Sequence, residues 1–309
     1  MATRIGLRDL FAAMPRALGR YTGTLLAVFV VQTLVALACM GAVSMVLART
    51  FGKLPMFDEA VDGNLVALIY CLRHGKDALL ASVGMVLGSV MLWQLAAWFV
   101  IGGINGVLAN RPEGRAETAK CFGASGASTY LRYVRLSMCS LPGLMIVMIV
   151  LGACLGLVIE RIEYALTIAQ LMGALAIALL PALLLLHFLW TVADYARVEI
   201  TLRGDSHDPS VVMTYLRTLA YVIKRPITLL HTGIGWIAFL LISIGYIYLA
   251  AGHPMYGAEG AVTLFVIRQG VALARTAIRV GVMSGQIELG KTRALPPRHV
   301  EAKSDAKKS

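Results

Sequence analysis

Three arginines lie in a stretch of the chain that is otherwise apolar enough to cross a membrane. The segment RQGVALARTAIR contains Arg268, Arg275 and Arg279. At about 100° per residue in an α-helix, the three side chains fall within roughly 20° of one line, together with Gln286. They therefore form one polar stripe, which could either bind an anion or form ion pairs with buried carboxylates.

The depth of each arginine decides which of them needs a partner. If the helix begins near Ala261, Arg268 lies about 10 Å into the membrane, Arg275 near the midplane and Arg279 about 27 Å in. Arg268 and Arg279 could extend their side chains to an interface, whereas Arg275 cannot do so easily. A central arginine costs roughly 2.5–3.5 kcal/mol even on the lenient insertion scale, so Arg275 is expected to face the bundle interior.

The candidate partners are two acids in the segment TVADYARVEI, Asp194 and Glu199. Asp194 and Arg279 are expected at similar depths, which predicts a structural ion pair between them. Three positive charges facing one or two acids also leave surplus positive charge, which is typical of an anion site or a cleft for lipid headgroups. Both interpretations of the stripe are open from the sequence.

Other chemistry finds no support in the sequence. There is no HExxH motif, no Walker-type glycine loop and no GxSxG elbow. The five cysteines form no CxxC pair, and the histidines are scattered. We therefore expect no catalytic residues, no metal site, no cofactor and no enzymatic activity. The glycine-rich segment GASGAS, residues 123–128, is expected to be a flexible lead-in to a helix.

Long apolar segments supply the elements that position the stripe. The 309 residues are 58% hydrophobic and only 15% charged, which is far more apolar than a soluble domain. About 20 apolar residues suffice to cross a hydrocarbon layer of roughly 30 Å. Six stretches qualify: 22–47, 79–106, 138–158, 166–193, 228–250 and 261–284. The predicted fold class is all-α, a polytopic membrane helix bundle with six transmembrane helices and short cytoplasmic interfacial helices.

The distribution of lysine and arginine predicts the orientation. Twenty of them lie in the N-terminal arm, the second and fourth loops and the tail, against five on the other side. Because cytoplasmic loops carry the excess of positive charge, both termini are expected in the cytoplasm. The expected location is a cell membrane, the bacterial inner membrane. The net charge of +11 is then explained by anionic lipid headgroups on the cytoplasmic face and requires no nucleic acid.

A short amphipathic pattern precedes every second predicted span. Apolar residues at helical spacing cover 7–18, 127–138 and 212–223, and arginine and tyrosine flank them. One membrane domain over 1–290 could thus consist of three repeats of an interfacial helix and two spans, at 7–111, 127–203 and 212–291, before a disordered basic tail at 291–309. The 30-residue segment 48–78 is expected to be an outer loop. Close helix packing is predicted at three small-residue motifs: Gly84-x-x-x-Gly88, Gly152-x-x-x-Gly156 and Gly281-x-x-x-Gly285.

Three short motifs carry a resemblance to known proteins. DYARVE at 194–199, KRP at 224–226 and ALARTAIR at 272–279 lie in the C-terminal 120 residues. This part resembles a broad group of uncharacterised bacterial six-helix integral membrane proteins, and is similar in style to the membrane domain fused to some glycerophosphodiester phosphodiesterases. The resemblance implies a membrane-embedded helical domain and no activity, because the chain contains no phosphodiesterase catalytic domain.

Two functions fit these features. One is a non-enzymatic membrane scaffold or assembly component, which would bind another membrane protein. The alternative is a transporter or lipid-handling protein that binds an anionic solute or headgroup along the arginine stripe. The two differ in whether Arg268, Arg275 and Arg279 are neutralised by Asp194 and Glu199.

Overall fold

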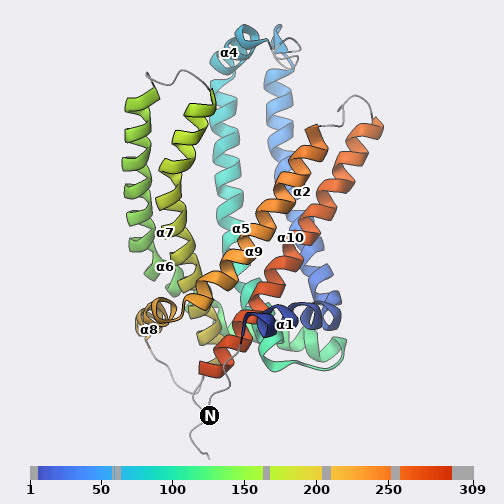
Figure 1. Ribbon diagram of the computed structural model, residues 1–309. Helices are drawn as coiled ribbons and strands as arrows, with labels where there is room; N and C mark the ends of the chain where they lie inside the picture. Colours follow the sequence, from blue (N-terminus) through green and yellow to red (C-terminus); the bar gives the residue numbers. More distant parts are fainter. Residues whose placement is uncertain are drawn as a thin grey trace, which may run out of the picture. The chain divides into compact units, whose positions relative to one another are not determined.

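The regular structure of the described residues is entirely α-helical (Figure 1). The structure is a computed structural model that describes residues 6–57, 59, 64–162, 168–203, 210–251 and 258–293. The helices are α1 (Leu7–Arg20), α2 (Thr22–Phe51), α4 (Leu65–His74), α5 (Lys76–Asn110), α6 (Arg115–Ile162), α7 (Ile168–Arg203), α8 (Val211–Lys224), α9 (Pro226–Ala251) and α10 (Ala258–Arg293).

Five of these helices are long and apolar enough to cross a membrane: α2, α5, α6, α7 and α9. The prediction of an all-helical, multi-pass membrane protein is therefore confirmed. The count of six spans is not, because α10 does not meet the same criteria. Its arginines and its polar C-terminal half make it less apolar than the other long helices.

The described helices divide into two compact units. The first contains Met1–Leu25 and Ile101–Ser309, and the second contains Leu26–Val100. The second unit therefore holds most of α2, all of α4 and most of α5. The last ten residues of α5 belong to the first unit, which also contains every candidate site residue.

The second unit contains a helix that the sequence analysis missed. Residues 48–78 were expected to be a loop, but α2 continues to Phe51 and α4 follows it. The Asn64 side chain caps α4 by accepting hydrogen bonds from the backbone N–H groups of Val66 at 3.0 Å and Ala67 at 3.3 Å. A cap residue followed by an apolar run was the signal that could have predicted this helix.

In the first unit, α1 and α8 are short helices that lie across the ends of longer ones (Figure 1). We call this the α1/α8 end. Both were predicted as separate amphipathic helices. The third predicted one, 127–138, is instead continuous with α6, and so is the GASGAS segment, which was expected to be flexible. Tight packing explains this difference, because a Cβ on Gly102, Gly103 or Gly106 of α5 would collide with Thr129, Phe122 or Ser125 of α6.

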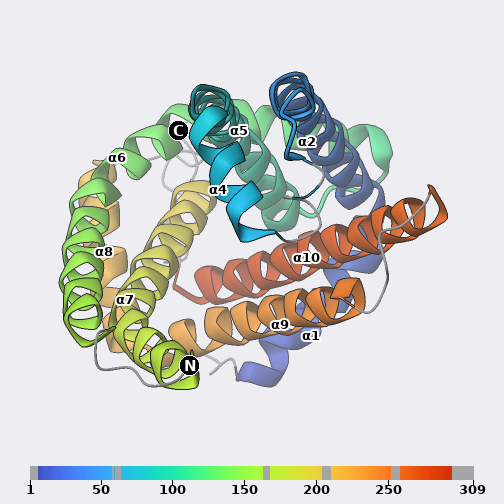
Figure 2. The same cartoon turned by 90° about the horizontal axis from the view of Figure 1, so that it is seen from above.

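Each amphipathic segment packs against the second long helix of another predicted repeat. The start of α6 packs against the end of α5, α8 packs against α7, and α1 packs against α10. The chain therefore returns on itself in the first unit, since its first helix packs against its last. In Figure 2, α1 lies beneath the adjacent α9 and α10.

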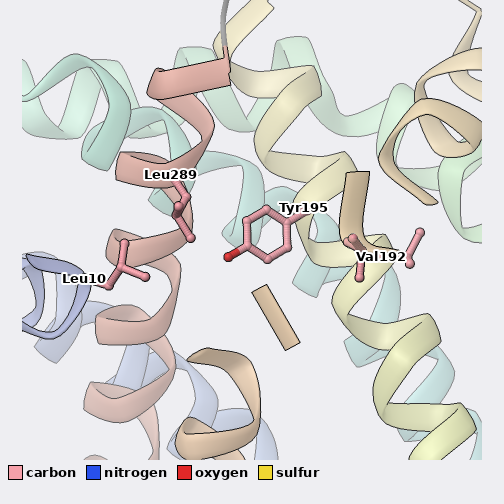
Figure 3. Close-up of a cluster of buried hydrophobic side chains, with 5 residues drawn as sticks. Leu10, Val192, Tyr195 and Leu289 are labelled. Atoms are coloured by element: carbon pink, nitrogen blue, oxygen red, sulfur yellow. The ribbon is translucent and has the colours of Figure 1, made fainter. Parts of the chain in front are cut away.

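The core of the first unit lies at the α1/α8 end. Leu10 of α1, Leu289 of α10 and Val192 and Tyr195 of α7 pack together with Val222 of α8 (Figure 3). Farther along the long helices, many apolar side chains are exposed, including Leu183 of α7 and Leu240 of α9. This arrangement suits helices whose outer surfaces contact lipid.

Candidate functional site

Arg275 contacts the neighbouring helix α9 and, among the described residues, no acid. Its Nη2 donates a hydrogen bond of 2.6 Å to the hydroxyl of Ser243, which in turn donates 2.6 Å to the carbonyl of Phe239. The guanidinium carbon lies 4.5 Å from the centre of the Phe239 ring, which is a cation–π contact. Arg275 Nε is buried and has no hydrogen-bond partner among the described residues. Arg275 is therefore held by polar and aromatic groups that leave its charge uncompensated.

An aromatic series connects this contact to α7. The Phe239 ring contacts Trp236 of the same helix at 5.8 Å between ring centres, and Trp236 contacts Trp190 of α7 edge to face at 5.6 Å. Close by, the Thr191 and Thr232 hydroxyls share a buried hydrogen bond of 2.9 Å. Side chains of α7, α9 and α10 thus form one connected region around Arg275.

Arg279 lies one helical turn farther along α10, close to two charges of α7. The carboxylate of Asp194 attracts its guanidinium and Arg197 repels it. The Asp194 carboxylate, however, already accepts a hydrogen bond of 2.6 Å from Arg197 Nη1 within α7. Arg279 itself is exposed, and it makes no ion pair within 4.0 Å in the described part of the chain. The predicted ion pair between Arg279 and Asp194 therefore stays a prediction.

Glu199, the second candidate partner, is used within its own region. Its carboxylate is buried, lies 2.5 Å from Arg203 Nη2 and accepts a hydrogen bond of 3.1 Å from Thr218 of α8. The bond from Thr218 joins α8 to α7, and both of these contacts of Glu199 are made away from the stripe arginines. Arg268, the remaining stripe residue, is exposed.

A buried polar network behind Asp194 was not anticipated from the sequence. The Tyr133 hydroxyl of α6 accepts a hydrogen bond of 3.0 Å from the Asn105 amide of α5. The same hydroxyl lies 2.7 Å from the Thr201 hydroxyl and 3.1 Å from the Arg197 carbonyl, both of α7. The network joins three helices at the level of the Arg197–Asp194 pair. Its members are separated by up to 96 positions in the sequence, so no local pattern could have predicted it.

A charged cleft at the α1/α8 end was also missed. It has a volume of about 380 Å³ and lies between α1, the end of α5 and α10. Arg111 Nη2 lies 2.6 Å from Glu288, and Arg20 Nη2 lies 3.3 Å from Glu113. The full lining is Asp9, Ala13, Arg16, Ala17, Arg20, Tyr21, Leu108, Arg111, Ser284 and Glu288. The residues come from distant segments, which explains why sequence reasoning did not group them.

Comparison with known proteins adds no relative: no family model, no curated protein and no solved structure matches the chain. The resemblance to bacterial six-helix membrane proteins therefore stays a prediction. The function has to be argued from the geometry of the site.

Proposed function

We propose that this chain is a six-span integral membrane protein that binds an anionic lipid at the α10 arginines. The sixth span would be α10, whose 36 residues extend over about 54 Å, more than a hydrocarbon layer requires. It also packs along α9, which is apolar enough to span. The basic residues near α1 and α8 favour a cytoplasmic location for that end, and the bacterial inner membrane is the membrane we propose.

A single observation carries the proposed activity: both candidate acids already pair with arginines of α7. Asp194 pairs with Arg197 and Glu199 with Arg203. Within the described residues, Arg268, Arg275 and Arg279 form no ion pair with a carboxylate. The positive charge of the stripe therefore exceeds the negative charge available to it.

The membrane makes this surplus chemically important. An unpaired arginine at hydrocarbon depth is unfavourable, and such residues generally pair or mark a path for a ligand. A lipid phosphate would supply the missing negative charge, and its acyl chains could lie against the exposed apolar side chains of α7 and α9. Arg275, held in place by Ser243 and Phe239, would present a preorganised cation to this headgroup.

The scaffold function predicted from the sequence has no feature of its own among the described residues. Exposed apolar side chains on the long helices are expected of any protein in lipid. We therefore propose lipid binding as the function, with a membrane-protein partner as a separate expectation.

Native mass spectrometry of the detergent-solubilised protein tests the proposal. The wild type should retain phosphatidylglycerol in preference to phosphatidylcholine. Arg279→Leu, and the double variant with Arg275→Leu, should lose this preference by about tenfold, because a charge-assisted contact contributes roughly 1.5–3 kcal/mol. Arg217→Leu is the matched control, since Arg217 is exposed on α8 and lies outside the stripe.

The unfolding midpoint, measured on lipid-depleted samples, separates binding from folding. If the arginines are structural, their removal should lower the midpoint and leave the lipid preference unchanged. That result would show that the stripe is not a lipid site. So would a lipid preference in both stripe variants equal to that of the wild type.

A further inference from the structure

The cleft at the α1/α8 end differs from the α10 stripe in position and composition. Its volume of about 380 Å³ lies within the range of small-molecule sites. Three arginines line it: Arg16 and Arg20 from α1 and Arg111 from the turn after α5. None of these arginines is in the predicted membrane-spanning stretches, which favours a position of the cleft near the headgroups.

Two of the three arginines are fixed by neighbouring groups. Arg111 pairs with Glu288 of α10, and Arg20 Nη2 donates both to the Arg111 carbonyl at 3.2 Å and to Glu113. These contacts connect the end of α1, the turn after α5 and α10. They hold the guanidinium groups in place without a bound ligand, which lowers the ordering cost of binding one.

Arg16 is the lining arginine without a carboxylate partner in the described part of the chain. Its Nε donates 2.9 Å to the Ala12 carbonyl one turn earlier in α1, which orients the guanidinium group. Its two terminal amino groups are then available to a ligand. The acid on the same helix, Asp9, accepts a hydrogen bond of 3.1 Å from the Gly6 N–H and so caps the start of α1.

Tyr21 provides a second, independent indication of a ligand. It lines the cleft and is buried, yet its hydroxyl has no hydrogen-bond partner among the described residues. Buried polar groups nearly always have a partner, so an unpaired one needs an explanation. Burial raises the pKa of the Tyr21 phenol, which therefore stays protonated at neutral pH and can donate.

We propose that this cleft binds a phosphate group. Arg16 would be the principal contact, and Arg20 and Arg111 would line the phosphate on the other sides. Guanidinium groups donate in a planar fork that matches phosphate oxygens, and several forks can contact one phosphate. Two carboxylates also line the cleft. Glu288 forms an ion pair with Arg111, and Asp9 accepts a hydrogen bond from the Gly6 N–H, so neither is paired with Arg16. The phosphate could belong to a lipid headgroup or to a soluble ligand, because both share this chemistry.

Two probes distinguish the sources. Lipid-depleted protein in nonionic detergent is titrated with inorganic phosphate by calorimetry, and in parallel its retention of phosphatidylglycerol over phosphatidylcholine is measured by native mass spectrometry. If the wild type binds inorganic phosphate and Arg16→Gln binds it at least tenfold more weakly, the ligand is soluble. If no inorganic phosphate binds, loss of one retained phosphatidylglycerol in Arg16→Gln, with the lipid that Arg279→Leu loses still bound, supports a headgroup in the cleft.

Arg8→Gln is the matched control, because Arg8 is an exposed arginine of the same helix outside the cleft. Arg16→Lys keeps the positive charge but lacks the planar guanidinium group, so it should bind the probe at least threefold more weakly than the wild type. This variant tests the proposal even if Arg16→Gln does not fold. Binding of neither probe to the wild type, or equal binding by wild type and both Arg16 variants, overturns the proposal. If the wild type binds no inorganic phosphate, loss of phosphatidylglycerol in Arg279→Leu but not in Arg16→Gln would overturn the cleft site while leaving the α10 site intact.

Discussion

Gly285 of α10 lies directly against the buried imidazole of His231 of α9. A Cβ added at Gly285 would come within 2.5 Å of His231 Nε2 and 3.3 Å of the Leu10 carbonyl of α1. The His231 ring also contacts Phe11 of α1 at 5.5 Å between ring centres. One glycine therefore allows three helices to meet at the α1/α8 end.

Gly285→Ala is expected to lower the free energy of unfolding by about 1–3 kcal/mol, because the new methyl group overpacks a site whose neighbours cannot move away. The midpoint of thermal unfolding in detergent measures this. Gly152→Ala is the matched control, since nothing lies within 4 Å of its added Cβ and helix propensity changes equally. Equal midpoints for the two variants would contradict the close packing of α1, α9 and α10.

Sequence reasoning predicted the long helices well and their contacts only in part. Apolar length alone indicates a span, which is why α2, α5, α6, α7 and α9 were found. Of the three GxxxG motifs, only the one at Gly281 and Gly285 faces neighbouring helices. The close packing predicted for the other two is wrong, because open space surrounds their glycines: Gly84, Gly88, Gly152 and Gly156. The motif itself is identical in each case. Which glycine packs depends on tertiary neighbours that spacing does not encode.

Tyr133→Phe tests the buried network on α5, α6 and α7. Removal of the hydroxyl deprives the Asn105 amide of its acceptor, and Asn105 Oδ1 is already unpaired within the described residues. We expect a loss of about 1–3 kcal/mol of stability, the cost of a buried unsatisfied group. Chemical denaturation in mixed micelles would measure it.

Tyr130→Phe is the control for this change, because Tyr130 is on the same helix and its hydroxyl makes no hydrogen bond in the described part of the chain. A loss as large in Tyr130→Phe as in Tyr133→Phe would mean that the network does not stabilise the bundle.

The two faces of α8 are expected to respond oppositely to substitution. Thr214 and Thr218 face the protein and are buried, while Leu216 and Ile223 are exposed. Thr218→Leu should destabilise the protein by about 1–3 kcal/mol, because a larger apolar side chain replaces the donor to Glu199. Leu216→Ser should leave unfolding in detergent within about 0.5 kcal/mol of wild type. The opposite order of effects would place the apolar face of α8 against the protein.

The amphipathic pattern of α8 was visible in the sequence, but its orientation was not. Apolar spacing identified the stripe with Leu216 and Ile223, which are exposed, whereas Tyr215 and Leu219 at its edge are partly buried against the core. Inside a soluble protein such a stripe would face the core. At a membrane surface the apolar face can turn to lipid, and the polar face with Thr218 is then free to bond Glu199. The solvent around the protein decides between the two, and it is not part of the sequence pattern.

The proposal for the α10 arginines depends on whether α10 crosses the membrane, which single-cysteine labelling can decide. In a chain whose five native cysteines are replaced by alanine, Glu259→Cys marks the start of α10 and Thr292→Cys marks its end. Arg217→Cys on α8 is the reference for the α1/α8 end. A membrane-impermeant maleimide added to intact cells should label Glu259→Cys, and it should label the other two positions only after the membrane is opened.

This result would place Arg275 and Arg279 between two labelled boundaries and therefore at hydrocarbon depth. An arginine at that depth without a carboxylate requires another source of negative charge, as the lipid proposal supplies. If Glu259→Cys and Thr292→Cys are instead labelled from the same side, α10 does not cross, and water can solvate its arginines. The surplus charge would then need no ligand, and the lipid site on α10 would be wrong even though every contact of Arg275 with Ser243 and Phe239 remained as described.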